Sequence, residues 1–385
     1  MKKKISVVTG SRADFGLLQG VISRIQSAPN LELELIVTGS HLSETFGSTK
    51  DEIALAGYTN LVELDLNIAM NSESDTGFAI SEIIRQITKH YSKRRPSLTL
   101  VLGDRYEIFG AAVACTAMGI PLGHIHGGEI TNGSKDDMYR HAITKLASVH
   151  FVANSEFHNR VIKMGENPKT VFVVGGLGID SIDQIELLTK SDLEIQLGIT
   201  LSSHYALVTY HADTIYPEQS LDQLEILLRS IKKFPKIQFI ATGANADYYG
   251  EQINFRLQEA SSQEKNLFFY QSVGQQKYLS LLSGAKFVLG NSSSGLLEAP
   301  TFGIATINIG TRQQGRPRAL SVIDVEFSED AITRGVAEAS SERFIDSITR
   351  VQNPYGVAGA SGKISDVLES LDFDALLPKQ FLDAP

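Results

Sequence analysis

Two histidines, two glycines and a glutamate stand close together in the segment His124-Ile125-His126-Gly127-Gly128-Glu129, which includes the end of a short apolar run. If an extended strand persists through the segment, both imidazoles lie on the same side, and the glycines let a ligand approach the backbone closely. These side chains could hold a metal ion, but the HxHxxE spacing is not one of the strong zinc signatures. Histidine and carboxylate groups also suit proton transfer near neutral pH. We therefore favour general acid–base chemistry and expect no metal.

Further acidic residues follow or neighbour other apolar runs. Asp104 and Arg105 stand just after residues 98–102, where an active site is expected in an α/β protein, although Asp104 alone could simply cap the next helix. Asp136 and Asp137 open a helical segment and are explained equally well as N-terminal caps or as catalytic acids. These carboxylates are therefore candidates for proton transfer.

Two glycine-flanked loops have the composition of phosphate-binding loops. The first, residues 10–16, contains Arg12, whose guanidinium offers a fork of hydrogen-bond donors at the start of a helix. The second, residues 290–298, contains Ser292-Ser293-Ser294 and ends on Glu298. Three serines are more than a helix cap requires, so we expect this loop to bind a phosphate, with Glu298 accepting hydrogen bonds from sugar hydroxyls.

Other polar residues follow two more apolar runs. Arg312 and Arg316 lie in the loop at residues 310–316, where two cations could neutralise a diphosphate. His211 ends the run at residues 206–210, where it is either a satisfied structural group or a ligand contact.

The elements that position these residues follow an α/β pattern. Short β-branched runs alternate with helical patterns along the chain, which predicts βαβ units and parallel sheets. A glycine-dense break at residues 175–180 separates two series of runs, so we predict two doubly wound Rossmann-type domains, residues 1–180 and 181–360, facing a shared cleft. The expected strands are residues 5–9, 33–38, 98–102, 122–125, 149–153, 171–174, 206–210, 237–242, 267–270, 286–289 and 305–309.

The composition limits the class of protein. The chain has 385 residues, 42% of them hydrophobic and 21% charged, as in an ordinary soluble protein. A net charge of −9 argues against a nucleic-acid binder, which needs clustered Lys and Arg. The one cysteine, Cys115, excludes an internal disulfide and favours a cytoplasmic setting. The longest apolar stretch, residues 108–122, is too short to span a bilayer, so we expect no membrane association.

Taken in order, these motifs resemble those of the hydrolysing UDP-N-acetylglucosamine 2-epimerases of sialic and legionaminic acid biosynthesis. The resemblance covers nearly the whole chain and implies a GT-B-like pair of Rossmann-type domains. It implies that the C-terminal domain holds the nucleotide and that a helix within residues 361–385 rejoins the first domain. The motifs are VTGSRADFG at 8–16, LGDRYEIF at 102–109, HIHGGE at 124–129, RHAITKLA at 140–147, GNSSSGLLE at 290–298 and INIGTRQQGR at 307–316.

The resemblance also implies the reaction. UDP is eliminated anti across C1 and C2 to leave a 2-acetamidoglucal, and water then adds syn to give the free 2-epimer, which is N-acetylmannosamine when the substrate is UDP-N-acetylglucosamine. No cofactor is needed. UDP-N,N'-diacetylbacillosamine is the alternative substrate, since HIHGGE is shared by such enzymes. A GT-B glycosyltransferase and a catalytically silent nucleotide-sugar sensor are the alternatives from other classes. The family further suggests a homo-oligomer, either dimer or tetramer.

Site residues are carried over by motif. One departure is His126, which stands where many members have the middle Glu of HIEGGE; it acts there as base or acid, or it positions the substrate. The residues that match catalytic positions are Asp104, His126, Glu129 and Asp136. The residues that match substrate or UDP positions are Arg12, Arg105, His211, Asn245, Ser272, Val273, Ser292, Ser293, Glu298, Arg312 and Arg316.

Overall fold

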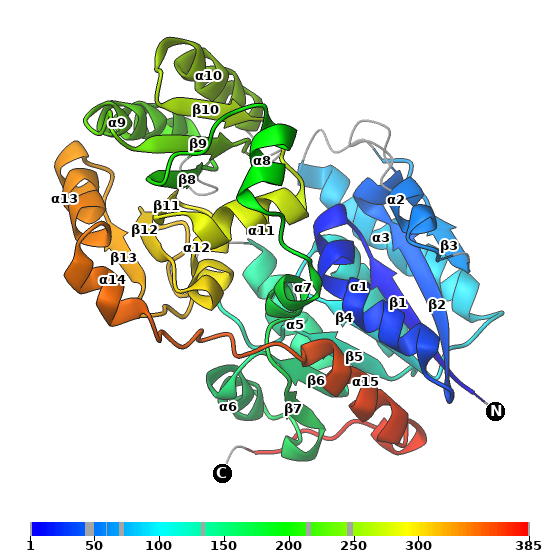
Figure 1. Ribbon diagram of the computed structural model, residues 1–385. Coiled ribbons are helices and arrows are strands. Elements are labelled where there is room, and N and C mark those ends of the chain that lie inside the picture. Colours follow the sequence, from blue (N-terminus) through cyan, green and yellow to red (C-terminus); the bar gives the residue numbers. More distant parts are fainter. Residues whose placement is uncertain are drawn as a thin grey trace. The chain divides into compact units, whose positions relative to one another are not determined.

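The computed structural model describes residues 2–42, 50–58, 60–68, 73–131, 135–212, 217–244 and 249–383. Within these residues the chain forms two compact units (Figure 1). The first unit is built on residues 1–130, 135–181 and 356–385, and the second mainly on residues 182–355. Each unit contains one parallel sheet with helices on both faces.

The sheet of the first unit is parallel throughout, in the order β3-β2-β1-β4-β5-β6-β7. Its central strands are apolar on both sides because helices cover both faces, which is why they read as continuous apolar runs in the sequence. The strands are β1 (Lys3–Thr9), β2 (Leu31–Thr38), β3 (Leu61–Leu64), β4 (Leu98–Leu102), β5 (Leu122–Ile125), β6 (Val149–Val152) and β7 (Val171–Val173).

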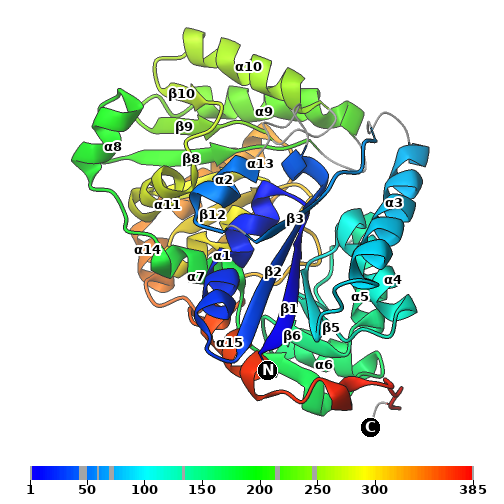
Figure 2. The ribbon, with the colours of Figure 1, turned by 90° about the vertical axis from the view of Figure 1, so that its right-hand side faces the viewer.

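Two hydrophobic cores lie on the two faces of this sheet. Figure 2 shows α3, α4 and α5 along one face, and α1 and α15 along the other. Helix α15 lies at the far end of the chain, and the carboxylate of Asp180 accepts hydrogen bonds from the first amides of this helix, at 2.6 Å from Gly359 and 2.8 Å from Ala360. The helices are α1 (Arg12–Ser27), α2 (Lys50–Leu55), α3 (Glu73–Tyr91), α4 (Tyr106–Ala117), α5 (Lys135–Leu146), α6 (Ser155–Lys163), α7 (Leu177–Gln184) and α15 (Ala360–Ser370).

The second unit has the same plan, with a parallel sheet in the order β10-β9-β8-β11-β12-β13. Helices α9, α10, α13 and α14 pack on one face, and α8 and α11 pack on the other. The elements are α8 (Lys190–Leu197), β8 (Tyr205–Thr209), α9 (Ser220–Lys232), β9 (Gln238–Thr242), α10 (Gly250–Gln263), β10 (Leu267–Tyr270), α11 (Gln275–Gly284), β11 (Phe287–Gly290), α12 (Ser294–Leu297), β12 (Ala305–Ile309), β13 (Val322–Val325), α13 (Glu329–Ala339) and α14 (Glu342–Ile348).

Every strand predicted from an apolar run is present, with each end within two residues of its predicted position. Two strands were not predicted, β3 and β13, and both lie at an edge of their sheet. An edge strand is covered incompletely, so several residues of β3 and β13 are partly or fully exposed and the apolar run is short. No helix in the described residues is long and apolar enough to cross a membrane; the apolar stretch at residues 108–122 forms most of α4 and the start of β5.

The strand order identifies the edge of each sheet where ligands bind in this kind of fold. The order reverses between β1 and β4 in the first unit and between β8 and β11 in the second. Open α/β sheets bind ligands outside the carboxyl ends of their strands, at such a reversal point. The loop carrying Asp104 follows β4, and the serine loop follows β11, so both occupy this position.

Candidate active site

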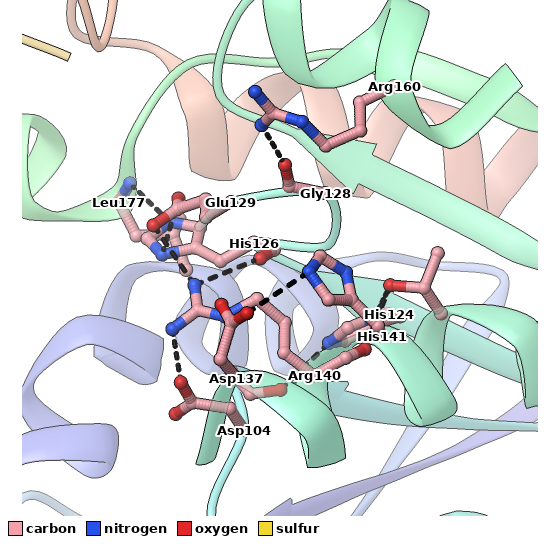
Figure 3. Close-up of polar contacts among 12 residues, drawn as sticks. Asp104, His124, His126, Gly128, Glu129, Asp137, Arg140, His141, Arg160 and Leu177 are labelled. Carbon is pink, nitrogen blue, oxygen red and sulfur yellow. Dashed lines mark hydrogen bonds and ion pairs between the residues drawn. The ribbon is translucent and has the colours of Figure 1, made fainter. Parts of the chain in front are cut away.

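One buried guanidinium links the acidic loops of the first unit. Arg140 lies on α5 with a side chain only 6% exposed, and its Nη1 donates a hydrogen bond to Glu129 Oε2 at 3.1 Å (Figure 3). Its Nη2 donates to the carboxylate of Asp104, and Nη1 also lies 3.5 Å from the carbonyl oxygen of His126. Although burial opposes it, the neighbouring Asp104 and Glu129 carboxylates raise the pKa of Arg140. The cation therefore holds two partly buried carboxylates together, one from each loop.

The loop that carries Glu129 has an unusual backbone path. His126 has a φ of +64°, a left-handed backbone conformation that residues other than glycine rarely adopt, and Gly128 has a φ of +77°. A Cβ at Gly128 would come within 2.8 Å of the Phe157 carbonyl oxygen, and Arg160 donates a hydrogen bond to the Gly128 carbonyl. These contacts turn the chain away from β5, and Glu129 faces Arg140.

The hydrogen bonds of His126 define its tautomer. Its Nε2 accepts a hydrogen bond from the backbone N–H of Leu177 at 3.3 Å. A neutral imidazole that accepts at Nε2 carries its proton on Nδ1. That Nδ1 lies 3.5 Å from Glu129 Oε1, so the ring is directed at the carboxylate (Figure 3). The imidazole of His126 therefore lies beside the Glu129 carboxylate.

His124 has a different position from His126. Strand β5 ends at Ile125, so the alternation that we expected to place both imidazoles on the same side does not reach His126. His124 is fully buried, and its Nε2–H donates to the carbonyl of Gly103 at 2.8 Å, just before Asp104. Burial lowers the pKa of His124 to about 3. It is therefore a neutral support for the Asp104 loop.

Buried histidines make the stability of the fold depend on pH. Burial lowers the pKa of His124 to about 3, of His41 to about 4 and of His211 to about 3. An unfolded chain protonates its histidines below a pH of about 6.5, whereas the folded chain does so only near these lower values, so protons favour unfolding throughout that interval. Asp14 opposes this, because burial raises its pKa to about 6 and the folded state then binds a proton first as the pH falls. Burial also raises the pKa values of Asp136 and Glu298, and it also lowers the pKa of His150, so four histidines act against three carboxyls and the histidines prevail.

We therefore expect the free energy of unfolding to fall as the pH is lowered from about 6.5 to about 5. The variant His124→Gln keeps an N–H donor for the Gly103 carbonyl and should reduce this slope by about 1.4 kcal/mol per pH unit. Urea unfolding of both proteins, followed by circular dichroism at several pH values, measures the slopes. Equal slopes would contradict a neutral buried His124.

Arg105 follows Asp104 and begins a second ionic cluster. It is the N-terminal cap residue of α4 and makes no side-chain capping bond, so the alternative in which Asp104 caps this helix is wrong. Its guanidinium donates to both oxygens of the buried Glu107, at 2.8 and 3.2 Å, and its Nε lies 4.0 Å from Asp14 Oδ2. The Arg105 side chain remains 38% exposed. It can therefore also meet a ligand.

Asp136 and Asp137 lie in the first turn of α5, where negative charge favours the helix. Desolvation and the negative charge of Asp104 raise the pKa of Asp136. Asp137 pairs instead with His141, at 3.4 Å along the same helix. Asp104, His126 and Glu129 thus come together around Arg140, and Asp136 lies in the first turn of the helix that carries Arg140.

Asn291 organises the corresponding end of the second sheet. Its Oδ1 accepts from the backbone N–H of His211 and its Nδ2 donates to the His211 carbonyl, both at 2.8 Å. The carbonyl of Asn291 accepts from Gln313 Nε2 at 2.8 Å and from Arg312 Nη1 at 3.3 Å. Burial lowers the pKa of His211 to about 3, and the positive charge of Arg312 contributes to the same shift to a smaller extent. Asn291 therefore joins the loops after β8, β11 and β12.

A chain of hydroxyl groups holds Glu298. Tyr278 donates to Ser294 Oγ at 2.7 Å, and Ser294 donates in turn to Glu298 Oε2 at 2.5 Å. Burial raises the pKa of Glu298, and the hydrogen bond from Ser294 opposes that rise. Ser292 accepts from the Ser294 amide at 3.4 Å, and Ser293 precedes α12 without a capping bond from its side chain. One oxygen of Glu298 is thus fixed.

The remaining predicted residues are spread over other loops. Ser272 and Val273 lie between β10 and α11, where the Ser272 hydroxyl accepts from the Gly274 amide at 3.3 Å. Arg316 follows β12, and its carbonyl accepts from Arg318 at 2.7 Å. Two predictions cannot be placed: the side chain of Arg12, at the start of α1, and the whole of Asn245 lie outside the described residues.

Four residues that organise these sites were not predicted: Arg140, Glu107, Tyr278 and Asn291. Arg140 could have been found, since it begins the RHAITKLA motif and lies one helical turn after Asp136 and Asp137. Asn291 begins the serine loop, but nothing in its type indicates that it would bond to His211. No group of three or more His, Cys, Asp or Glu side chains within the described residues could hold a metal ion.

Comparison with known proteins identifies the family. The family model for UDP-N-acetylglucosamine 2-epimerase matches residues 23–369. The chain belongs to this family. The assignment as a 2-epimerase enzyme, predicted from the ordered motifs, is thereby confirmed, and Arg140, Asp104 and Glu129 all lie within the matched region.

Relatives of this 2-epimerase match it over the full length. Polysialic acid biosynthesis protein P7 of Escherichia coli is 36% identical over 100% of this chain and 98% of its own. The hydrolysing GDP/UDP-N,N'-diacetylbacillosamine 2-epimerase of Campylobacter jejuni is 34% identical over 99% of both chains. A crystal structure of the Neisseria meningitidis UDP-GlcNAc 2-epimerase, bound to UDP-GlcNAc, aligns with a TM-score of 0.81 at 20% identity, covering 95% of this chain and 99% of that one.

The structural likeness confirms the predicted fold class, a GT-B-like α/β chain with two doubly wound Rossmann-type units. The family model shows the kind of enzyme, and the geometry shows which of its side chains lie together. In this 2-epimerase the carboxylates of Asp104 and Glu129 share the guanidinium of Arg140.

Proposed function

We propose that this enzyme is a hydrolysing 2-epimerase of a UDP-linked 2-acetamido sugar, with UDP-N-acetylglucosamine as the first candidate substrate. The observation that carries the proposal is the pair of carboxylates joined by Arg140 in a member of the 2-epimerase family. UDP-N,N'-diacetylbacillosamine is the second candidate, because the Campylobacter jejuni relative is named for that substrate.

The reaction needs a base at C2 and stabilisation of the departing phosphate. A base removes the C2 proton while the bond from C1 to the phosphate oxygen breaks, which gives UDP and a 2-acetamidoglucal. Water then adds syn: its oxygen bonds to C1 and a proton reaches C2 on the same face, opposite to the face that the original C2 proton left, which gives the free 2-epimer. The C2 proton is weakly acidic, so the base must be held in place and the developing phosphate charge must be met by cations or amides.

We assign proton transfer to the first unit. Asp104 and Glu129 are the candidate bases, since their side chains remain 20% and 12% exposed while Arg140 fixes one oxygen of each. Asp136, in the first turn of the helix that carries Arg140, is the candidate partner for the second proton transfer, because its raised pKa favours a protonated carboxyl compared with an ordinary aspartate.

We assign His126 the role of orienting Glu129, not of removing the proton. The variant His126→Asn keeps a residue that tolerates the left-handed backbone but loses the imidazole. It should lower kcat by about ten-fold, the size expected when a reacting group is slightly misplaced. Steady-state kinetics compare it with Glu129→Gln. A loss of kcat as large as that of Glu129→Gln would give His126 the proton transfer instead.

We assign nucleotide binding to the second unit, through Arg312, His211, the serine loop and Glu298. A charge-assisted hydrogen bond to phosphate contributes about 1.5–3 kcal/mol, so Arg312→Ala should weaken UDP binding by about 10- to 100-fold. Isothermal titration with UDP measures this, and Arg334→Ala, which removes an exposed arginine on α13, is the matched control. Unchanged UDP affinity in Arg312→Ala would contradict the assignment.

The product assay tests the function itself. The pure enzyme is incubated in deuterated water with each UDP sugar, and the products are followed by NMR. The expected products are UDP and a free 2-epimer that carries deuterium at C2, from one of the two substrates. Products that all remain UDP-linked would instead indicate a non-hydrolysing epimerase. Transfer of the sugar to an added acceptor would indicate a glycosyltransferase. UDP binding without turnover of either sugar would indicate a catalytically silent nucleotide-sugar sensor.

The cytoplasmic location and the homo-oligomeric state stay predictions of the sequence analysis. Light scattering of the pure protein measures the mass in solution, and a mass of two or four chains is expected.

A further inference from the structure

Glu166 is a buried carboxylate that the proposed reaction does not use. Its side chain is only 1% exposed and accepts hydrogen bonds from His150 Nε2 at 2.9 Å, Lys145 Nζ at 2.6 Å and Lys379 Nζ at 2.7 Å. Burial alone would raise the pKa of Glu166, but the hydrogen bonds lower it to about 2. Burial also lowers the pKa of His150, which leaves that ring neutral. One carboxylate is thus held by two ammonium groups.

Lys379 also closes the end of α5. Its Nζ donates to the carbonyls of Lys145 at 2.5 Å and Ala147 at 2.6 Å. The last carbonyls of a helix have no donor within the helix, and a cation there interacts favourably with the helix dipole. Lys379 donates to one of them, that of Lys145, and to the carbonyl of Ala147 just after the helix, and it places a positive charge at this end of the helix.

The residues after Lys379 are seated on the same surface. The Leu382 amide donates to the Gly165 carbonyl at 3.1 Å, and the Phe381 ring lies 4.7 Å from Lys145 Nζ. A Cβ at Gly165 would lie 2.5 Å from that ring, so this position requires glycine. We call residues 379–382 the C-terminal strap.

Helix α5 connects the C-terminal strap to the candidate active site. Arg140 lies five residues before Lys145 on α5, or about 7.5 Å along the helix axis. A helix moves as a rigid rod over such a length, so a shift at its end displaces the guanidinium. We propose that Lys379 is a positioning residue, which caps α5 and pairs with Glu166 so that Arg140 meets Asp104 and Glu129. The inference rests on the proposed function, since it assigns Lys379 an effect on that reaction.

The chain offers a matched control for this role. Lys3 donates to the carbonyl of Leu371 at 2.6 Å and lies 3.4 Å from that of Glu369, at the end of α15, and its Nζ lies over Phe373 at 5.0 Å. It therefore shares with Lys379 the role of a lysine whose ammonium group binds carbonyls at the end of a helix. Helix α15 carries none of the candidate site residues. Loss of either cap should lower stability, but only loss of Lys379 should change turnover.

The experiment compares Lys379→Met with Lys3→Met in the full chain. We expect Lys379→Met to lower kcat by about ten-fold, because Arg140 is displaced slightly, with KM and UDP affinity within about two-fold. Lys379→Arg keeps the charge and the donors and should recover most of the lost kcat. Lys3→Met should keep the kcat of the unmodified enzyme. Thermal unfolding of all three variants shows how much of each effect is general destabilisation.

A double variant tests whether the effect passes through Arg140. If it does, Lys379→Met should change kcat less than about two-fold in an Arg140→Lys background, because residues that act as one unit are not additive. Equal kcat for Lys379→Met and Lys3→Met, or a full ten-fold loss in the Arg140→Lys background, would overturn the inference. An unmodified enzyme without epimerase activity would instead overturn the proposed function, so the two failures are distinguishable.

Discussion

Replacing Asp104 with Asn, or Glu129 with Gln, is expected to lower kcat by about a thousand-fold or more, in the upper part of the range for loss of an acid–base group. Each substitution keeps the shape of the side chain and an oxygen that can accept from Arg140, so the loop geometry survives. What is lost is the basicity of the carboxylate. Since UDP binding is assigned to the second unit, the UDP affinity of each variant should stay within about three-fold of that of the unmodified enzyme. This limit corresponds to a change in binding free energy below about 0.7 kcal/mol.

The measurement separates turnover from binding. Steady-state kinetics with the better of the two UDP sugars gives kcat and KM, and titration gives the affinity for UDP. Glu82→Gln is the matched control, since it removes a carboxylate that pairs with Arg85 on the surface of α3. If Asp104→Asn retained activity and lost UDP binding, the division of roles between the two units would be reversed.

Sequence patterns predicted the interior of both sheets because parallel strands covered on both faces are almost entirely apolar. Strands β8 and β12 are buried at every residue and were predicted within a residue. The edge strands β3 and β13 lack this signal because Glu63 and Asp324 interrupt their short apolar runs. The edge strands β7 and β10 are also partly exposed, but their runs are apolar at every residue and both were predicted. What the sequence could show was therefore limited by whether each apolar run is uninterrupted.

The candidate site was predictable only as far as it follows strand ends. Asp104 and Glu129 follow neighbouring strands of a parallel sheet, so their proximity could be expected from the strand pattern. The orientation of His126 could not, because its left-handed backbone depends on contacts made by Gly128 and Leu177. Arg140 could not be placed either, because the direction of a side chain on a helix depends on how that helix packs.

Arg140 also changes how the acidic charge of the chain is understood. The net charge of −9 includes several carboxylates in the candidate site, and two of them meet one cation there. Coulomb repulsion between two poorly solvated carboxylates is strong, and a buried guanidinium between them removes it. The same cation would therefore serve both stability and turnover.

Replacing Arg140 with Met should test both effects at once. Removal of one partner from a buried ion pair typically costs about 3–5 kcal/mol, because the remaining charge has no compensation. Here two carboxylates would remain, with side chains only 20% and 12% exposed. We therefore expect a loss of stability of that size, together with a fall in kcat of about a thousand-fold. Arg140→Lys keeps the charge but loses the planar fork, so it should lose about 30- to 100-fold in kcat and much less stability.

A double-variant cycle distinguishes charge compensation from packing. If the cost of Arg140→Met comes from uncompensated carboxylates, adding Glu129→Gln should recover about 1–3 kcal/mol of the lost stability while turnover stays absent. Urea unfolding gives the stabilities, and the control Arg85→Met removes an exposed arginine that also pairs with a carboxylate. Additive stabilities in the double variant would mean that Arg140 acts through packing alone. If Arg140 compensates the charge of both carboxylates, the double variant should regain stability but not activity.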